Sequence, residues 1–409
     1  MQQYIVGFDI GSRSIKAAVG EVRKKGQLTL LRIFKTDSQG VRKGAINDLS
    51  EATQAVNYLL GSIRRDYKNA VKHIYLGVGG GDVKLQSSTG VVAVSRSDSE
   101  IYQDDISRAI QGSQAINLPP NRTILHFLIQ QFIVDDVKDV KDPLGMIGSR
   151  LEVEGLVVHV FQPVLKNLSK CIETSGGSVA GLVLSPLADA QSVLSKNQKE
   201  LGVVLVDIGF GKTGMAVFEE NKLLSSAMFP IGSSNVTNDL AIGLKIPVEV
   251  AETIKLSFGY GVAKEVSVKE VVDLSKIDEN AKGLVSKRFI AEIIEIRLQE
   301  IFELINAELK RIQKDGRLPA GVVLTGAGSK LPGLVDLVKR ELKLPAQVGI
   351  PHISQMDVVG GELGFQAEDP EFSTALGLLL SGSEKLTNFS GHSLSFTRVI
   401  RNIVKYLIP

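Results

Sequence analysis

The chain carries an internal repeat that limits the folds open to it. Residues 5–19 (IVGFDIGSRSIKAAV) align without a gap with residues 203–217 (VVLVDIGFGKTGMAV). The identical pairs include Asp9 with Asp207, Ile10 with Ile208, Gly11 with Gly209, Ala18 with Ala216, and Val19 with Val217. Each copy reads as an apolar strand, a turn with glycine and a second apolar strand, which predicts a β-hairpin rather than a strand followed by a helix. Two such hairpins predict two similar lobes.

Length and composition set the class of protein. With 409 residues, 44% hydrophobic and 22% charged, the chain is long and apolar enough for two or three globular domains. Forty-seven Lys and Arg against 45 Asp and Glu give a net charge of +2, so we expect no nucleic-acid partner. The single cysteine, Cys171, excludes an intrachain disulfide, and neither a signal sequence nor a long apolar run is evident. We expect a soluble cytoplasmic protein.

The turns of the two hairpins have the chemistry of a phosphate site. Glycine lets successive backbone N–H groups approach an anion with no Cβ in the way. The candidate residues are Gly11, Ser12 and Arg13 in the first turn, and Gly209, Gly211, Lys212 and Thr213 in the second. Asp9 and Asp207, at the strand ends, could hold Mg²⁺ through water. The alternative is that each Asp-Ile-Gly merely ends a strand, because Asp and Gly favour turns; two aligned copies favour the phosphate site.

Two further segments fit the rest of a nucleotide. The loop Gly326, Ala327 and Gly328 lies between an apolar strand and a helix predicted to begin near Leu331, so a base or ribose could lie against its backbone. Glu252 and Lys255 stand three residues apart on a predicted helix, where they could hold ribose hydroxyls and base. An exposed salt bridge is the alternative for that pair.

Apolar spacing and turn residues predict the remaining elements. Helices are expected over residues 48–63 (capped by Asn47 or Asp48), 104–114, 164–175, 187–195, 238–243, 248–256, 287–312, 334–342 and 376–380, and strands over 73–78, 181–184 and 321–324. The expected domains are a first lobe over 1–82 and 163–198, an inserted subdomain over 83–162, a second lobe over 199–374 with a smaller subdomain at about 240–312, a connecting helix over 375–380, a flexible linker over 381–395 and a terminal helix over 396–409.

Several motifs, taken in order, resemble a known superfamily. The two hairpins, SPLADA (185–190), VVLTGAGSKLPG (322–333) and FSTALGLLL (372–380) are similar to those of the actin, heat-shock chaperone and sugar kinase superfamily. Within it, the chain most resembles the FtsA family of bacterial cell-division proteins. That choice rests on DPLGMIGSRLEVEGLVVHV (142–160), FPIGSSNVTNDLAIGL (229–244) and AETIKLSFG (251–259). The resemblance covers essentially the whole chain.

This resemblance implies a fold, cofactors and partners. The implied fold is α/β and actin-like (ribonuclease H-like), with two lobes, an inserted subdomain that replaces one actin subdomain, and a C-terminal amphipathic helix. ATP with Mg²⁺ is implied between the lobes, where Lys16 and Gly232 would join the site. The implied partners are the C-terminal tail of the tubulin-like protein FtsZ, other copies of the chain in a filament, anionic lipid of the inner membrane at the division site, and later division proteins. Arg288 and Arg297 are the implied contacts for the acidic FtsZ tail; a solvated helix face is the alternative.

The C-terminal segment has the pattern of a basic amphipathic helix. The candidate membrane residues are Phe396, Val399, Ile400, Arg401, Ile403, Val404, Lys405 and Leu407. About 13 helical residues span roughly 20 Å, which is too short for a bilayer core of about 30 Å but suits the interface of anionic lipid. A helix docked on its own domain or on a partner is the alternative, and the resemblance favours the membrane.

Departures from the superfamily pattern argue against rapid hydrolysis. Ser185 stands where several relatives carry an acidic residue or glutamine that orients the attacking water. Asp189, one turn later, is the weak catalytic candidate, and a position on the helix surface is its alternative. Phe210 and Lys212 make the second turn bulkier and more cationic. Two rivals remain open, an ATP-turnover enzyme such as a sugar kinase or chaperone ATPase, and a PilM-like scaffold of a pilus or secretion machine.

Overall fold

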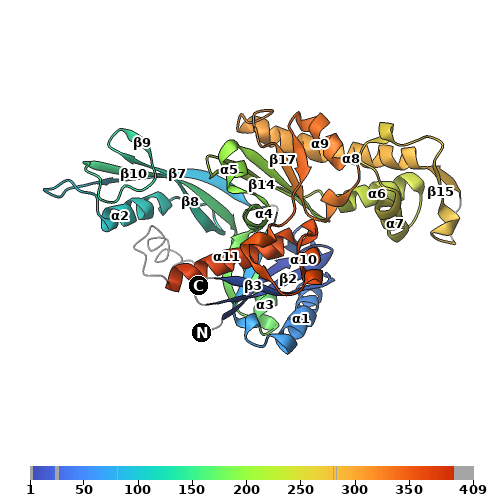
Figure 1. Ribbon diagram of the computed structural model, residues 1–409, viewed down its shortest axis with the longest axis horizontal. Coiled ribbons are helices and arrows are strands. Elements are labelled where there is room, and N and C mark those ends of the chain that lie inside the picture. Colours follow the sequence, from blue (N-terminus) through green and yellow to red (C-terminus); the bar gives the residue numbers. More distant parts are fainter. Residues whose placement is uncertain (1–2, 24–26, 81, 280, 282, 391–409) are drawn as a thin grey trace. The chain divides into compact units, whose positions relative to one another are not determined.

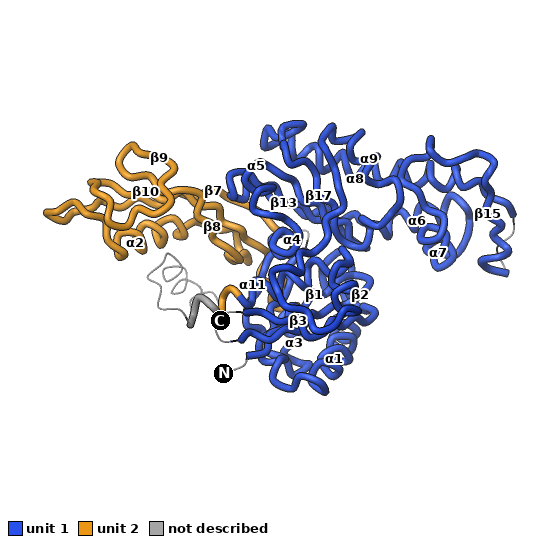
Figure 2. The backbone as a smooth tube through the Cα atoms, in the orientation of Figure 1, with its two compact units in different colours: residues 1–81, 169–383 blue, residues 82–168, 384–409 orange. Residues whose placement is uncertain are grey.

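The computed structural model describes residues 3–23, 27–80, 82–279, 281 and 283–390. It divides into two compact units, one formed by residues 1–81 and 169–383 and the other by 82–168 and 384–409 (Figure 2). Each unit is described by itself.

The first unit begins with a sheet built around the first hairpin. The strands are β1 (Gln3–Ile10), β2 (Ser14–Val22), β3 (Leu28–Asp37), β6 (Ile74–Val78), β11 (Val179–Leu184) and β19 (Asp357–Val358), in the order β11-β6-β1-β2-β3-β19. β1, β2 and β3 pair antiparallel, whereas β6 and β11 lie parallel to β1. The predicted first hairpin is therefore confirmed.

A second sheet in the same unit repeats this topology. Its strands are β12 (Val203–Ile208), β13 (Thr213–Glu219), β14 (Lys222–Phe229), β17 (Val322–Thr325) and β18 (Ala346–Val348), in the order β14-β13-β12-β17-β18. Order and strand directions match those of β3-β2-β1-β6-β11. The sequence repeat is thus a repeat of structure, although the third strands, β3 and β14, were not predicted.

Two helices connect the repeated halves and pack on each other through glycine. They are α4 (Ser185–Val193) and α11 (Ser373–Ser390), labelled in Figure 1. A methyl group on Gly377 would lie 1.8 Å from the carbonyl oxygen of Ala188, and one on Gly7 of β1 would lie 2.1 Å from that of Ala375. Since no side chain fits at either point, the backbones themselves are in contact there.

Six further helices of the described residues were predicted from apolar spacing, namely α1 (Leu49–Asp66), α3 (Gln162–Thr174), α6 (Ser233–Leu244), α7 (Val248–Phe258), α8 (Lys287–Arg311) and α9 (Leu334–Leu342). Helices α5 (Lys196–Leu201) and α10 (Gly361–Ala367) were not predicted, and short strand pairs occur at β4 (Val41–Arg42) with β5 (Ala45–Ile46) and β15 (Val271–Asp273) with β16 (Leu284–Ser286). Asp48 caps α1 by accepting a hydrogen bond from the Glu51 N–H at 3.0 Å, which decides between the two predicted caps.

The second unit is built on an antiparallel sheet of the order β7-β10-β8-β9. Its strands are β7 (Lys84–Ala93), β8 (Arg122–Val134), β9 (Val137–Val140) and β10 (Arg150–Phe161), and α2 (Gln103–Gln114) packs on the sheet (Figure 1). Ile106 and Ile110 of α2 share a core with Phe132, Leu151 and Val153. The predicted insert, 83–162, falls within this unit, and the helix expected at 104–114 is present.

Three local predictions need correction. α6 begins at Ser233 rather than Asn238, because the N–H groups of Ser233 and Ser234 donate to the carbonyls of Gly209 and Phe210 in the second hairpin. The loop that holds Gly326, Ala327 and Gly328 leads into a 3₁₀ turn, Ala327–Lys330, and not into a helix near Leu331. Helix α9 follows Gly333, whose φ is 74°, and has the bounds 334–342 that were predicted for it.

The third correction concerns the predicted linker over 381–395. Residues 381–390 continue helix α11, because Ser381 donates to the Gln191 side chain at 2.8 Å and Gly382 packs against the Tyr75 ring. The predicted membrane helix, residues 396–409, lies outside the described residues. Within the described part of the chain, no helix combines the length and apolar character that crossing a membrane requires.

Candidate nucleotide site

A cavity of about 490 Å³ lies between the turns of the two hairpins, wholly within the first unit. It is lined by fourteen of the sixteen residues that the sequence predicted for the nucleotide, namely Asp9, Gly11, Ser12, Arg13, Lys16, Asp207, Gly209, Gly211, Lys212, Glu252, Lys255, Gly326, Ala327 and Gly328. Segments more than 300 residues apart thus converge on one site.

The two remaining predicted residues support the second turn from behind. Thr213 is buried, and its hydroxyl donates to the Ile231 carbonyl at 2.8 Å. A methyl group on Gly232 would lie 2.7 Å from the carbonyl oxygens of Gly209 and Phe210. Both residues therefore shape the turn and do not line the cavity.

The two turns touch each other at the mouth of the site. A methyl group on Gly211 would lie 2.8 Å from Ser12 Oγ. The Arg13 guanidinium reaches Glu252 Oε1 at 3.2 Å and lies over the Phe210 ring, 5.2 Å from its centre. Because Arg13 belongs to the first hairpin and both partners belong to the second half, these contacts join the halves.

Glu252 and Lys255 of α7 form a buried cluster on one wall. Lys255 Nζ donates to Glu252 Oε2 at 2.7 Å and to Thr237 Oγ1 at 2.8 Å. Burial opposes ionisation of Glu252, but the hydrogen bonds from Lys255 and Thr237 prevail and lower its pKa. Lys255 is 7% exposed, so the alternative of an exposed salt bridge is wrong.

Three carboxyl groups approach the base of the cavity. Asp9 and Asp207 end β1 and β12, and Lys16 Nζ lies 4.0 Å from Asp9 Oδ2. Burial raises the pKa of Asp207 to about 6, against the lowering effect of Lys212. These two carboxylates face the cavity from opposite halves, which fits the hydrated Mg²⁺ predicted for them.

The third carboxyl, Asp189, is enclosed beneath the site. It is fully buried, so the alternative of a helix-surface residue is wrong. Its Oδ1 accepts a hydrogen bond from Thr374 at 2.7 Å, and its Oδ2 has no partner within the described part of the chain. Burial, and then the neighbouring Asp207, raise the pKa of Asp189 well above the ordinary value. Asp189 therefore keeps its proton more readily than an ordinary aspartate.

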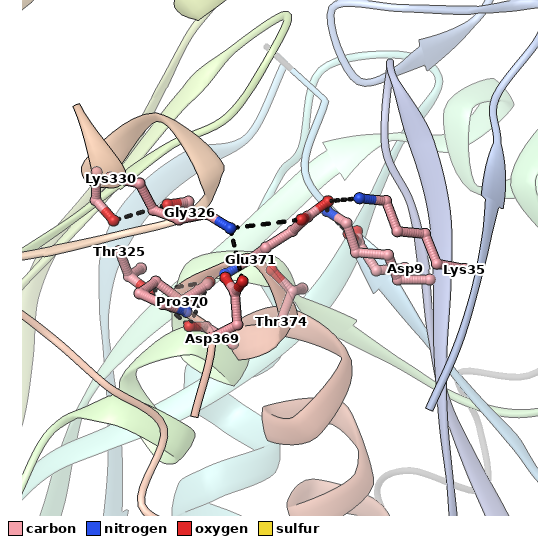
Figure 3. Close-up of polar contacts among 12 residues, drawn as sticks. Asp9, Lys35, Thr325, Gly326, Lys330, Asp369, Pro370, Glu371 and Thr374 are labelled. Atoms are coloured by element: carbon pink, nitrogen blue, oxygen red, sulfur yellow. Dashed lines mark hydrogen bonds and ion pairs between the residues drawn. The ribbon is translucent and has the colours of Figure 1, made fainter. Parts of the chain in front are cut away.

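A second charged cluster, absent from the sequence prediction, centres on Glu371 (Figure 3). Its carboxylate lies 2.6 Å from Lys35 Nζ, 3.8 Å from Lys16 Nζ and 3.8 Å from Lys330 Nζ, while Lys330 also binds Asp369 at 2.6 Å. Lys35 and Glu371 stand in no motif. Lys16 was predicted for the site and Lys330 stands in VVLTGAGSKLPG (322–333). Asp369 also gives a signal, as an Asp-Pro helix start whose side chain accepts a hydrogen bond from the Glu371 N–H.

Comparisons with known proteins identify the family. The family model described as "Cell division protein FtsA" matches residues 204–377, and that described as "SHS2 domain inserted in FTSA" matches residues 80–159. The cell division protein FtsA of Pseudomonas aeruginosa is 34% identical over 393 residues, which cover 96% of this chain and 92% of the relative. The chain belongs to the FtsA family. FtsA of Bacillus subtilis is 33% identical over 374 residues, covering 91% of this chain and 82% of that protein.

Solved structures place this FtsA-family chain among actin-like proteins. The PilM–PilN type IV pilus biogenesis complex matches with a TM-score of 0.67 at 16% identity, covering 93% of this chain and 98% of the other. MreB5 of Spiroplasma citri bound to ADP matches with a TM-score of 0.53 at 11% identity, covering 95% and 97%. The predicted actin-like α/β fold with an inserted domain is confirmed.

Arg288 and Arg297, predicted to bind a partner, lie on α8 outside this cavity. Arg297 is held by both carboxylate oxygens of Asp239 on α6, with Nη2 2.9 Å from Oδ1, and by Glu300. Arg288 pairs with Glu292 at 3.5 Å. Any acidic peptide that binds Arg297 must compete with Asp239, so their role toward a partner stays a prediction.

Proposed function

We propose that this FtsA-family cell-division protein binds ATP with Mg²⁺ in the cavity between the hairpins and polymerises on the cytoplasmic face of the inner membrane at the division site. There it anchors the FtsZ ring through the C-terminal tail of FtsZ. One observation carries the proposal, namely that two turns repeated in sequence and in topology face a single cavity.

The polarity of the cavity supports a nucleotide as its ligand. The cavity is lined by the hairpin turns with Lys16 and Lys212, and also by the apolar residues Val236, Leu256 and Leu331 together with Leu298 and Pro332. A cavity of about 490 Å³ lies within the range that buries a small polar ligand with an apolar part. The polyphosphate would contact the turns and the two lysines, and the base would contact the apolar residues, with Mg²⁺ held through water by Asp9 and Asp207.

The arrangement favours binding over turnover. Ser185 lines the cavity at the position where a water-orienting carboxylate would stand, and Asp189 lies behind it with its pKa raised by burial. A carboxyl group that retains its proton is a poor base for an attacking water. We therefore expect hydrolysis that is weak or absent, which separates this chain from a sugar kinase or chaperone ATPase.

Assembly and anchoring follow from many weak contacts acting together. A filament presents many copies of the 396–409 segment to one membrane, so that lipid affinity rises by avidity. The smaller subdomain with Arg288 and Arg297 would receive the acidic FtsZ tail, and later division proteins would join the assembled filament.

Co-sedimentation with anionic vesicles tests this function. The full chain and a chain that ends at Ser395 are each mixed with vesicles, ATP and Mg²⁺, then centrifuged and viewed by electron microscopy. We expect only the full chain to pellet with lipid and to form filaments on the vesicles. If both chains stay in the supernatant, membrane anchoring is wrong and a PilM-like scaffold, the second candidate supported by the fold comparison, takes its place.

A further inference from the structure

The backbone of Lys212 belongs to the second hairpin, but the ammonium group of its side chain contacts the first half of the unit. Its Nζ donates a hydrogen bond to the carbonyl oxygen of Gly79, just beyond β6, at 2.8 Å. The lysine therefore links one repeated half to the other, and it also lines the cavity.

Two glycines provide the room for this side chain. A methyl group on Gly79 would lie 2.0 Å from Lys212 Nζ, and one on Gly44 would lie 2.9 Å from its Cδ. Contacts this short exclude any Cβ at either position while the lysine keeps its place. The position of the ammonium group is thus built into the fold by residues from three separate segments.

The ammonium group lies among the carboxyl groups at the base of the cavity without pairing to one. Burial raises the pKa of Asp207 and of Asp189, and the positive charge of Lys212 opposes that rise in both. Within the described part of the chain, no carboxylate oxygen comes within 4.0 Å of Nζ, and Gly79 is its one hydrogen-bond acceptor. An ammonium has three N–H donors, so two are left to meet a ligand.

A fixed cation at this point supplies charge that Mg²⁺ supplies in other nucleotide sites. Mg²⁺ neutralises phosphate oxygens and links them to carboxylates. Lys212 and Lys16 both line this cavity, and Lys16 Nζ lies 4.0 Å from Asp9 Oδ2. Two preplaced ammonium groups can therefore attract a polyphosphate with no metal present.

We propose that Lys212 makes nucleotide binding by this chain largely independent of Mg²⁺. The ligand class is a nucleoside triphosphate free of metal, and the inference rests on the proposed function because it assumes that this cavity is the ATP site. Mg²⁺ at Asp9 and Asp207 then adds little to the affinity while Lys212 is present.

Equilibrium titration with ATP tests this proposal on the full chain, in excess Mg²⁺ and in excess EDTA. For the wild type we expect dissociation constants within about threefold of each other in the two conditions. For Lys212→Met, which keeps the length and loses the charge, we expect about tenfold weaker binding in EDTA and recovery in Mg²⁺, the size of one lost charge contact at roughly 1.4 kcal/mol. Lys310→Met, an exposed lysine on α8 outside the cavity, is the matched control and should leave both values unchanged.

The outcomes separate the possible roles of Lys212. If it only tethers the two halves, Lys212→Met weakens binding equally in both conditions, which overturns the proposal. If the wild type binds ATP with Mg²⁺ but not with EDTA, the proposal is wrong while the proposed function stands. If the wild type binds ATP in neither condition, the proposed function itself fails. Because the wild type alone decides the last two cases, the test does not depend on the folding of a variant.

Discussion

The two hairpins have the same strand pairing, but their lysines stand at different positions. In the first, Asp9 at the end of β1 pairs across the ladder with Lys16 on β2. In the second, Asp207 pairs at the same position with Gly214, and the lysine stands two residues earlier, at Lys212 in the turn. Lys16 accordingly remains near its own aspartate and Glu371, whereas Lys212 crosses to Gly79 in the other half.

This difference separates what the fold requires from what the site requires. Asp-Ile-Gly occurs in both copies, because in each the first strand ends and the chain turns back at the glycine. The lysine near this motif occupies a different sequence position in each copy, Lys16 in the first and Lys212 in the second. As a result the two aspartates differ. Lys16 lies 4.0 Å from Asp9, whereas Asp207 has no ion-pair partner among the described residues and its pKa is raised by burial to about 6.

Replacing Gly7 of the first hairpin with the leucine found at the aligned position of the second should cause the largest loss of stability. Gly7 aligns with Leu205, but α11 passes so close to Gly7 that a methyl group there would lie 2.1 Å from the Ala375 carbonyl and 2.6 Å from the Leu379 nitrogen. We expect Gly7→Leu to destabilise the fold by more than about 4 kcal/mol, through overpacking against backbone. Soluble yield and urea unfolding measure this.

A glycine with free space around it provides the control. A methyl group on Gly61 of α1 would have no neighbour within 4 Å among the described residues, so Gly61→Ala should be neutral or stabilise by up to about 1 kcal/mol. Equal stability of Gly7→Leu and wild type would contradict the close packing of α11 on β1.

Asp189 allows the electrostatics beside the second hairpin to be tested by pH. Its raised pKa means that the folded state binds a proton that the unfolded state releases above the ordinary carboxyl pKa. Its contribution to stability is therefore full at low pH and is lost as pH rises. We expect Asp189→Asn to stabilise the protein by about 2 kcal/mol at neutral pH and to change little below pH 4.

Thermal unfolding across that pH range measures the difference. Asp48→Asn is a suitable control, because Asp48 lies on the surface and Asn also caps a helix. A constant difference between Asp189→Asn and wild type at all pH values would show that Asp189 does not gain a proton on folding.

The two aspartates proposed to hold Mg²⁺ can be compared where the ion should matter most, in the Lys212→Met background. There we expect Asp9→Ala and Asp207→Ala each to remove the Mg²⁺-dependent gain in ATP affinity, about tenfold. Titration with ATP at rising Mg²⁺ measures it. A gain that survives in both variants would remove these two residues from the metal site.

Removing the ion pair between Arg13 and Glu252 should have the smallest effect on stability. Arg13 is 52% exposed, so its ion pair with Glu252 is screened by solvent. We expect Arg13→Ala to change the free energy of unfolding by less than about 1 kcal/mol, and the change to shrink at high salt. Chemical unfolding at low and high salt measures it, with Arg23→Ala, whose Glu21 partner lies two residues away in the sequence, as the comparison. A loss that does not depend on salt would mean that stacking on Phe210 outweighs the ion pair.

Much of the fold was predictable because its signals are local. The repeat, the Asp48 cap and the apolar spacing of α2 and α8 each depend on residues close together in the sequence, and the structure has these elements within a few positions of the prediction. The segment 381–390 was not predictable from its Ser- and Gly-rich composition, because its helix depends on contacts with Gln191 and Tyr75.

The residues of the candidate site also fall into those with a local sequence signal, which were predicted, and those without one, which were missed. Glycine turns and their aspartates are visible as motifs, so the lining residues of the two hairpins were found. Glu371 and Lys35 were missed, because their pairing joins residues 336 positions apart and neither lies in a patterned segment. The burial of Asp189 was missed as well, since it depends on Thr374 of α11 covering α4.

A structure of the full chain with a non-hydrolysable ATP analogue tests the central claim most directly. We expect phosphates between the turns that contain Gly11 and Gly209, within hydrogen-bond distance of Lys212, and a base against Leu256 and Leu331. Phosphates bound elsewhere, or a cavity without nucleotide at saturating analogue, would contradict the assignment of the repeated turns as one nucleotide site.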